Sequence, residues 1–199
     1  MNRRDTTKDL DIRSALHAKH LRRLKAKPDT LVIDELGLAH ASSRIDVAVI
    51  NGCIHGYEIK SAKDTLDRLG AQIDIYRQTL QKLTIVAASR HVDDVMAHTP
   101  EWCGVIEAEQ GPRSGIRFNA IRTARTNPDI DPVMTAHLLW RTEVIDLLSQ
   151  IGYAPKELRR PRKQLYEMLC ETFTLHEIIA SIRTFMVQRQ AWRDRPARA

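Results

Sequence analysis

Residues 44–60 read RIDVAVINGCIHGYEIK, and this stretch decides the fold. The apolar runs 45–50 and 54–60 are rich in β-branched residues, which is typical of strands. Asn51-Gly52 between them is a strong hairpin signal. The stretch therefore predicts two antiparallel strands at the centre of a sheet.

An aspartate interrupts the first of these strands. Asp46 stands where a strand normally buries an apolar side chain, while Glu58 and Lys60 are two residues apart and so point to one face of the second strand. With a two-residue loop, Asp46 and Glu58 would lie on opposite faces of the sheet. For both carboxylates to share a face, we predict a three-residue loop over 51–53 or a β-bulge at Gly56.

Further helices and strands are predicted on both sides of the hairpin. Apolar residues from Leu66 to Leu83 repeat at alternating steps of three and four, which predicts a helix over 64–82. We expect an α/β fold with a four- to five-stranded mixed sheet flanked by helices. The other predicted elements are a helix over 9–26, strands at 31–33, 83–88 and 104–109, a helix near 92–98, and a short run at 115–118 that is a candidate for one more strand.

The composition changes after this α/β part. Residues 122–132 are rich in Arg, Thr, Asn, Asp and Pro and are typical of a linker. Beyond them, Asp131-Pro132 predicts a helix start, and Thr174 with Glu177 forms a capping box before an apolar stripe. We predict three parts: a core over 1–121, a linker over 122–132 and an α-helical C-terminal region over 133–199.

Composition and charge limit the function classes. The chain has 199 residues, is 43% apolar, and has no apolar run near the ~18 residues of a membrane span. Its three cysteines match no zinc spacing, so we expect reduced thiols in a cytoplasmic protein with no membrane partner. Residues 1–28 carry a net charge of +6 and residues 156–199 a net charge of +5 around an acidic centre. Two basic ends favour binding to a polyanion such as DNA.

The strand residues suggest a metal. Two carboxylates and an ammonium on neighbouring strands are costly to bury without a partner. Mg²⁺ prefers oxygen ligands, so Asp46, Glu58 and the Ile59 carbonyl form a candidate site for it. The alternative for Asp46 is an ion pair with Arg44 or Arg68.

The spacing also resembles a known family. Asp46 followed by Glu58-Ile59-Lys60 is similar to the signature of the PD-(D/E)XK nuclease superfamily, which has the restriction-endonuclease-like fold. Gln72 and Tyr76 resemble the QxxxY motif of its RecB-like and lambda-exonuclease-like branches. The whole pattern is also similar to a group of bacterial and prophage proteins.

The resemblance implies a metal-dependent deoxyribonuclease, a hydrolase that cleaves phosphodiester bonds with Mg²⁺, for which Mn²⁺ is expected to substitute. It implies that Glu35 is a further metal ligand, with Asp34 as the rival. Lys60 would orient the attacking water or stabilise developing charge, and its alternative role is a plain ion pair with Glu58. Gln72 would position the ExK strand or a substrate phosphate.

Four residues near the motif are candidate substrate contacts. Ser61, Lys63 and Arg68 are plausible phosphate ligands, with solvated surface as the alternative for each. Tyr76 shares a helix face with Gln72 and also lies on the apolar stripe, so a core position is its alternative.

A second functional hypothesis retains the nuclease fold but assigns no catalytic activity to it. In this alternative the chain is a non-catalytic DNA-binding or regulatory protein that retains a nuclease fold. The helical C-terminal region is then a candidate module for DNA or for a partner protein. A homodimer and a role in a phage or mobile element are compatible with both hypotheses.

Overall fold

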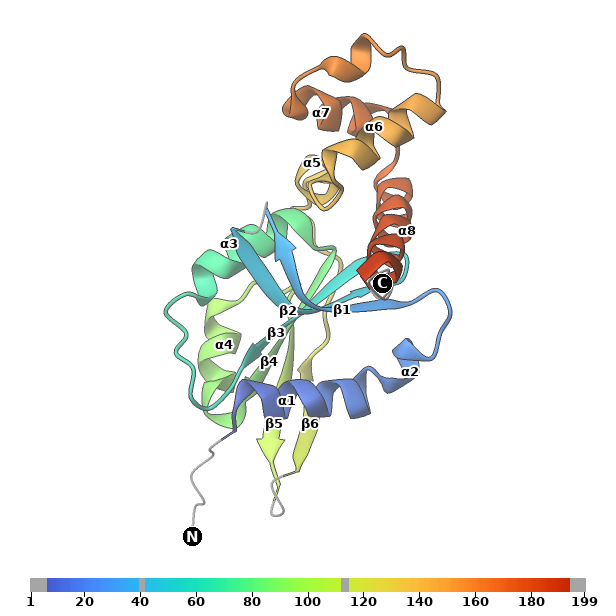
Figure 1. The fold of residues 1–199 in the computed structure, drawn as a ribbon. Helices are drawn as coiled ribbons and strands as arrows, with labels where there is room; N and C mark the ends of the chain where they lie inside the picture. Colours follow the sequence, from blue (N-terminus) through green and yellow to red (C-terminus); the bar gives the residue numbers. More distant parts are fainter. Residues whose placement is uncertain (1–6, 40–41, 112–114, 194–199) are drawn as a thin grey trace.

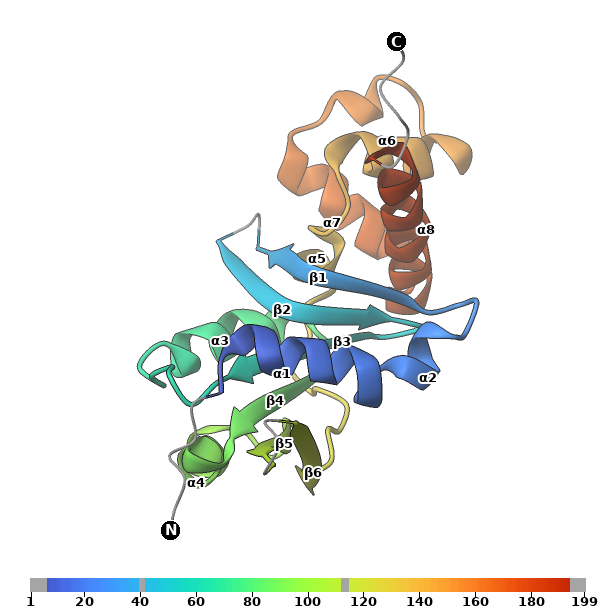
Figure 2. The same cartoon turned by 60° about the horizontal axis from the view of Figure 1, so that its bottom comes forward.

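The computed structural model describes residues 7–39, 42–111 and 115–193 (Figure 1). This part of the chain contains eight α-helices and an open mixed sheet of six strands. The α/β class is therefore confirmed. Figures 1 and 2 show helices α5 to α8 grouped beyond one end of the sheet, while α1 lies across one of its faces.

The strands follow one another across the sheet in chain order. The pairs β3–β4 and β4–β5 are parallel and the other pairs are antiparallel. The strands are β1 (Leu31–Leu38), β2 (Ser43–Ile50), β3 (Ile54–Lys60), β4 (Lys82–Ala88), β5 (Gly104–Gln110) and β6 (Ile116–Arg122). The prediction of four to five strands is wrong by one, because β6 is a full strand. Ile116, Phe118 and Ala120 alternate with polar residues, but the alternation ends at Ile121 and the strand is a half-exposed edge strand.

The hairpin at the centre has the predicted irregular loop. Val47 pairs with Tyr57 and Ile50 with Ile54, which leaves the three residues 51–53 as the loop. The predicted three-residue connection is confirmed, with Gly52 at φ +96°. The ladder between β2 and β3 stops at the Val47–Tyr57 pair, so Asp46 lies just where the two strands separate.

The two faces of the sheet bury different helices. On one face, Val47, Val49 and Tyr57 form an apolar cluster with Ile12 and Leu16 of the N-terminal helical segment. That segment consists of α1 (Asp9–Ala15), a π-helical turn η1 (Leu16–His20) and α2 (Arg22–Lys25). The sheet residues alternate between the faces, as the strand period requires.

On the other face, Ala48, Ile50 and Leu83 pack with Ile73 and Leu80, which belong to or directly follow α3 (Leu69–Thr79). This helix is shorter than the predicted 64–82. Residues 61–68 instead form a turn in which Asp64 accepts hydrogen bonds from the backbone N–H and the hydroxyl of Ser61. The carboxylate therefore competes with helix formation at this point.

The C-terminal helices share the core of the second face. Leu139, Val144, Leu165 and Ile182 are buried in the same apolar cluster as α3. The helices are α4 (Val92–His98), α5 (Pro132–Ala136), α6 (Arg141–Gln150), α7 (Arg162–Thr172) and α8 (Leu175–Arg193), with 3₁₀ turns η2 (Ser89–His91) and η3 (Glu157–Arg159). No helix among the described residues is long and apolar enough to cross a membrane.

The predicted caps of the helical region are confirmed. The Asp131 side chain accepts from the backbone N–H of Val133, and Thr174 and Glu177 form the reciprocal capping contacts.

The segment 122–132 is fixed to the core, because the Asn127 amide donates to the carbonyls of Arg77 and Leu80. The division into a core, a linker and a helical region stays a prediction.

Gly104 lies where β4, β5 and the chain after β6 come closest. A Cβ atom there would lie 2.8 Å from the backbone nitrogen of Ala124 and 2.8 Å from the Thr84 hydroxyl. We expect Gly104→Ala to lower the free energy of unfolding by about 1–3 kcal/mol, because backbone must shift to admit the methyl group. Urea unfolding followed by circular dichroism measures this change.

Gly70→Ala is the matched control, because a Cβ atom there meets nothing within 4 Å and Gly70 lies in α3. This variant should be neutral or more stable by up to about 1 kcal/mol, since alanine favours helix. Equal destabilisation by the two substitutions would contradict the close approach described for Gly104.

Candidate functional site

Asp46 is held at the point where β2 leaves β3. Its Oδ2 accepts a hydrogen bond of 2.6 Å from the Ile59 backbone N–H, so the side chain replaces the ladder contact that the separating strands lack. Its Oδ1 lies 3.0 Å from Nη2 of Arg13. The predicted alternatives for Asp46, ion pairs with Arg44 or Arg68, are both wrong, because the partner comes from α1.

Arg13 forms ion pairs with carboxylates on three elements: its own helix α1 and the strands β1 and β2. Its guanidinium pairs with Glu35 of β1 and Asp46 of β2, and its Nη2 lies 3.1 Å from Asp9 one helical turn earlier. The Arg13 and Asp46 side chains are 16% and 19% exposed, so water screens this pair less than the pairs with the more exposed Asp9 and Glu35. We call these four residues the Arg13 centre. A cation of the chain itself therefore neutralises the carboxylates that the sequence assigned to a metal.

Glu35 and Asp34, the two candidates for a further metal ligand, have different partners in the structure. The pairs Asp34–Val47 and Leu36–Ile45 place Glu35 opposite Asp46 across the two strands. Glu35 has φ +56°, an uncommon conformation for a residue other than glycine. Asp34 turns away and lies 2.7 Å from the His17 ring.

Glu58 belongs to a separate network on the α3 side of the sheet. Lys60 Nζ and Gln72 Nε2 donate to its Oε1 at 2.8 and 2.7 Å, and the Tyr76 hydroxyl lies 2.7 Å from its Oε2. Lys60 Nζ also donates to the side-chain amide oxygen Oε1 of Gln72 at 2.8 Å. We call these four residues the Glu58 network. Both Glu58 and Lys60 are buried, so their mutual satisfaction offsets the cost of desolvation.

The two carboxylates remain electrostatically linked. Burial, followed by the charge of Glu58, raises the pKa of Asp46 from 3.8 to about 7. The Ile59 N–H and Arg13 lower this pKa, but they do not outweigh burial, Glu58 and the further charge of Asp9. Burial and Glu58 also raise the pKa of the Tyr76 hydroxyl, so Tyr76 stays a neutral hydrogen-bond donor.

The predicted substrate contacts are dispersed. Ser61 is buried and its hydroxyl donates to Asp64, while Lys63 is exposed. Arg68 and Gln72 line a groove of about 480 Å³ with Glu35 and Arg44. Tyr76 is buried inside the Glu58 network. Their roles in substrate binding stay predictions. Gln72 lines the groove and belongs to the network, and the Tyr76 hydroxyl donates to the carbonyl of Arg44, which also lines the groove.

The donor atoms at Asp46 and Glu58 do not fit a metal ion in the described arrangement. Each of the four carboxylate oxygens already has a partner within the chain: Arg13, Ile59, Tyr76, or Lys60 together with Gln72. No group of three or more potential metal ligands is found among the described residues. The binding of Mg²⁺ or Mn²⁺ stays a prediction, with Asp46, Glu58, the Ile59 carbonyl and Glu35 as its ligands.

Fold and site together define a mixed α/β protein whose strand carboxylates are satisfied by its own arginine, lysine, glutamine and tyrosine. The family model described as bacteriophage P4 protein cII matches residues 2–195, and the chain belongs to this family. Protein cII of Enterobacteria phage P4 is 32% identical over 162 residues, which are 81% of this chain. The chain spans 60% of the length of that relative. No solved structure matches the chain.

The family match overturns the nuclease prediction. Membership of the PD-(D/E)XK superfamily, and with it the prediction of a metal-dependent deoxyribonuclease and phosphodiester hydrolase, is wrong, because the chain belongs to the phage cII family. The prediction of a phage protein agrees with this family. Asp46 and Glu58 belong to two different clusters, in which Arg13 and the chain's own donors occupy their oxygens.

Arg13 is the central residue that sequence reasoning missed. A partial signal was present, because Asp9 and Arg13 are four residues apart and Ile12 and Leu16 mark the buried side of the same helix. What the sequence does not show is that this helix docks next to β2, 33 residues later in the chain.

The raised pKa of Asp46 predicts a pH dependence of stability. As the pH rises from about 4 to about 7, Asp46 ionises in the unfolded chain before it ionises in the folded chain. Folding is therefore disfavoured progressively over this window, by up to about 1.4 kcal/mol per pH unit, and the effect is constant above it.

We expect the free energy of unfolding of the wild type to fall over this window relative to that of Asp46→Asn. Urea unfolding at several pH values measures the difference. Asp129→Asn, at an exposed position, is the control and should run parallel to the wild type. Parallel curves for the wild type and Asp46→Asn would contradict the raised pKa.

Removal of the guanidinium tests the Arg13 centre. We expect Arg13→Gln to destabilise the fold by roughly 2–4 kcal/mol at about pH 8, because it leaves a partly buried, ionised Asp46 without its cation. The loss should be smaller at about pH 5, where Asp46 is protonated. Arg22→Gln, on the exposed side of α2, should change stability little. A loss independent of pH would indicate that Arg13 acts only through packing.

Proposed function

We propose that this protein is a non-catalytic DNA-binding regulatory protein with a core of the restriction-endonuclease-like type, acting in the cytoplasm. Three features support the proposal. The order α1, three antiparallel strands, α3 and a parallel β4 agrees with that core type. The chain belongs to a phage cII family, and a strongly basic surface lies on its helical region.

The Arg13 centre supports the non-catalytic part of the proposal. A hydrolytic metal site needs carboxylate oxygens that are open to a cation and its waters. Here Arg13 supplies the positive charge at Asp46, and three donors surround Glu58. The same residues thereby fix the N-terminal helix and α3 to the sheet and give the centre a structural role.

A basic cluster in the helical region is the observation that carries DNA binding. The cluster consists of six exposed cationic residues: Arg141, Lys156, Arg159, Arg160, Arg162 and Lys163. We call it the tail cluster. The start of α6 lies against η3, since Arg141 Nη2 is 3.5 Å from the Leu158 carbonyl and 3.3 Å from the Arg160 carbonyl. Residues 17 and 19 positions apart in the sequence are thus brought together on one surface.

Most of this positive charge is uncompensated. Among the described residues, Lys163 is the member of the cluster with an ion-pair partner, Glu167, at 3.8 Å. Arg162 is oriented by Tyr166, with its guanidinium carbon 5.3 Å from the ring centre. Exposed cations of this density suit the phosphates of DNA, where binding releases counterions. A homodimer and a partner protein docked on the helical region are compatible additions.

Loss of two cluster charges tests the DNA interface. We expect Arg159→Gln combined with Arg160→Gln to weaken binding to duplex DNA about tenfold or more at ~0.1 M salt. The slope of log K against log salt should fall by about 2, because two phosphate contacts are lost. Fluorescence anisotropy of a labelled duplex, in Mg²⁺ and in EDTA, gives both quantities.

Arg77→Gln combined with Arg125→Gln removes the same charge from exposed positions outside the helical region and is the matched control. It should retain wild-type affinity and slope. A wild type that binds DNA without salt dependence, or that does not bind it, would refute the proposed function. Equal losses in both double variants would place the interface elsewhere.

A further inference from the structure

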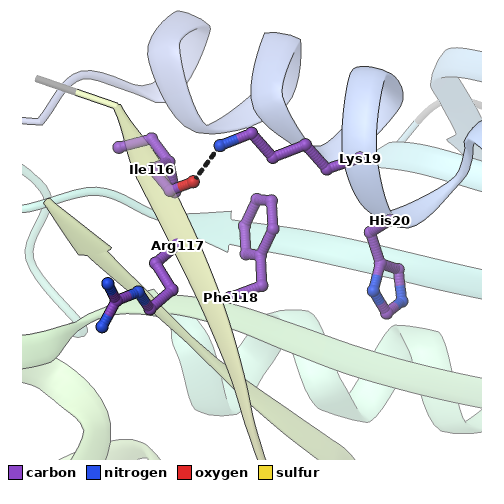
Figure 3. Close-up of a pocket in the computed structure, with 5 residues that line it drawn as sticks. All are labelled: Lys19, His20, Ile116, Arg117 and Phe118. Carbon is purple, nitrogen blue, oxygen red and sulfur yellow. Dashed lines mark hydrogen bonds between the residues drawn. The ribbon is translucent and has the colours of Figure 1, made fainter. Parts of the chain in front are cut away.

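A cleft lies between the π-helical turn η1 and the edge strand β6 (Figure 3). Its volume is about 410 Å³, which is within the range of small-molecule sites. It is lined by Lys19, His20, Ile116, Arg117 and Phe118. All five lie outside the Arg13 centre, the Glu58 network and the tail cluster.

The backbone of η1 places two of these side chains toward the strand. The Leu21 N–H donates to the Leu16 carbonyl five residues earlier, so the turn is wider than an α-helical one. Such π-turns occur frequently at functional sites. Lys19 reaches across and its ammonium donates to the Ile116 carbonyl at 2.5 Å (Figure 3). The Lys19 ammonium is thereby held at the edge of the cleft by a neutral acceptor, the Ile116 carbonyl.

Aromatic rings form the wall below this ammonium. The Phe118 and His20 ring centres are 6.3 Å apart at an angle of 63°, and His20 lies 5.8 Å from Tyr57. Burial lowers the pKa of His20, which keeps the imidazole neutral near pH 7. A neutral ring beside a phenyl ring can contact the face of a heteroaromatic ligand without charge repulsion.

Lys19 is the cation that reaches into the cleft, and its side chain is exposed. Arg117 points away from Lys19 (Figure 3) and lies 3.8 Å from Glu109. An anionic group would replace the neutral carbonyl as the partner of Lys19, and a hydrogen bond between two charged groups is stronger than one to a carbonyl.

We propose that this cleft binds a nucleotide, with the base against Phe118 and His20 and a phosphate against Lys19. Stacking of a base on an aromatic side chain is tolerant of base identity. Such a nucleotide has two sources, a free mononucleotide or an unpaired nucleotide of a DNA strand. Only the second source rests on the proposed DNA binding.

The test uses the full chain and isothermal titration calorimetry. The probes are dAMP, deoxyadenosine, inorganic phosphate and a short single-stranded oligonucleotide. We expect dAMP to bind more tightly than deoxyadenosine or phosphate alone, because each of these has only half of the recognised chemistry. Phe118→Leu and Lys19→Gln should each weaken dAMP about tenfold, by loss of stacking or of the phosphate contact.

Two control variants match these changes elsewhere in the chain. Phe173→Leu removes a partly buried ring of the helical region, and Lys27→Gln removes an exposed charge after α2. Both should bind dAMP as the wild type does. Lys19→Gln changes an exposed side chain, so it keeps the test decisive even if Phe118→Leu proves unstable on thermal unfolding.

The possible outcomes distinguish a failure of the cleft proposal from a failure of the DNA-binding proposal for the tail cluster. Binding of the oligonucleotide but not of dAMP, with the same sensitivity to Lys19→Gln, supports the cleft and assigns the nucleotide to a DNA strand. Phosphate binding equal to that of dAMP, or dAMP binding unchanged in both cleft variants, overturns the proposal. Absence of binding by dAMP and by the oligonucleotide also overturns it. A loss of duplex binding with intact dAMP binding would overturn the proposed function alone.

Discussion

Carboxylates from Asp9, Glu35 and Asp46 converge on the guanidinium of Arg13, and this contact joins the N-terminal helix to the first two strands. The apolar contacts of Ile12 and Leu16 place the helix on the sheet, but they leave the separated ends of β2 and β3 without a ladder. Asp46 closes that gap by accepting from the Ile59 N–H. Arg13 then supplies the charge that makes a partly buried aspartate acceptable at this position.

The Glu58 network solves the same problem for the carboxylate of β3. A buried glutamate beside a buried lysine is stable when every donor and acceptor has a partner, and Gln72 and Tyr76 of α3 complete that set. The motif that resembled a catalytic site thus fixes α3 against the sheet. Both clusters are satisfied within the chain, so the geometry and the membership of the phage cII family both argue against the nuclease prediction.

The strands and the central loop could be predicted because their signals are local. The alternation in 45–50, the Asn51-Gly52 turn and the parity of Asp46 and Glu58 fixed the register of β2 against β3. The helical stripe located α3, but the competing Asp64 turn delayed its start to Leu69. The edge strand β6 was underestimated, since its apolar alternation is short, from Ile116 to Ala120, and the strand is half exposed.

The chemistry of the site could not be predicted in the same way. Carboxylates on neighbouring strands require a positive charge, but the sequence does not say whether it is a metal ion or a side chain. That choice depends on where α1 docks, which is a long-range packing property. Residues of the η1–β6 cleft, such as Lys19 and Phe118, were missed for the same reason, because they come from opposite ends of the core sequence.

The central claim is that Arg13, and not a divalent cation, is the positive charge at Asp46. Carbon-13 NMR of the side-chain carboxyl groups during a Mg²⁺ titration of the full chain at about pH 8 tests it most directly, because Asp46 is then ionised. The account predicts that the Asp46 and Glu58 carboxyl resonances stay unchanged at millimolar Mg²⁺ while exposed carboxylates shift weakly and without saturation. A saturable shift of both resonances, with loss of the Arg13 contact, would contradict it.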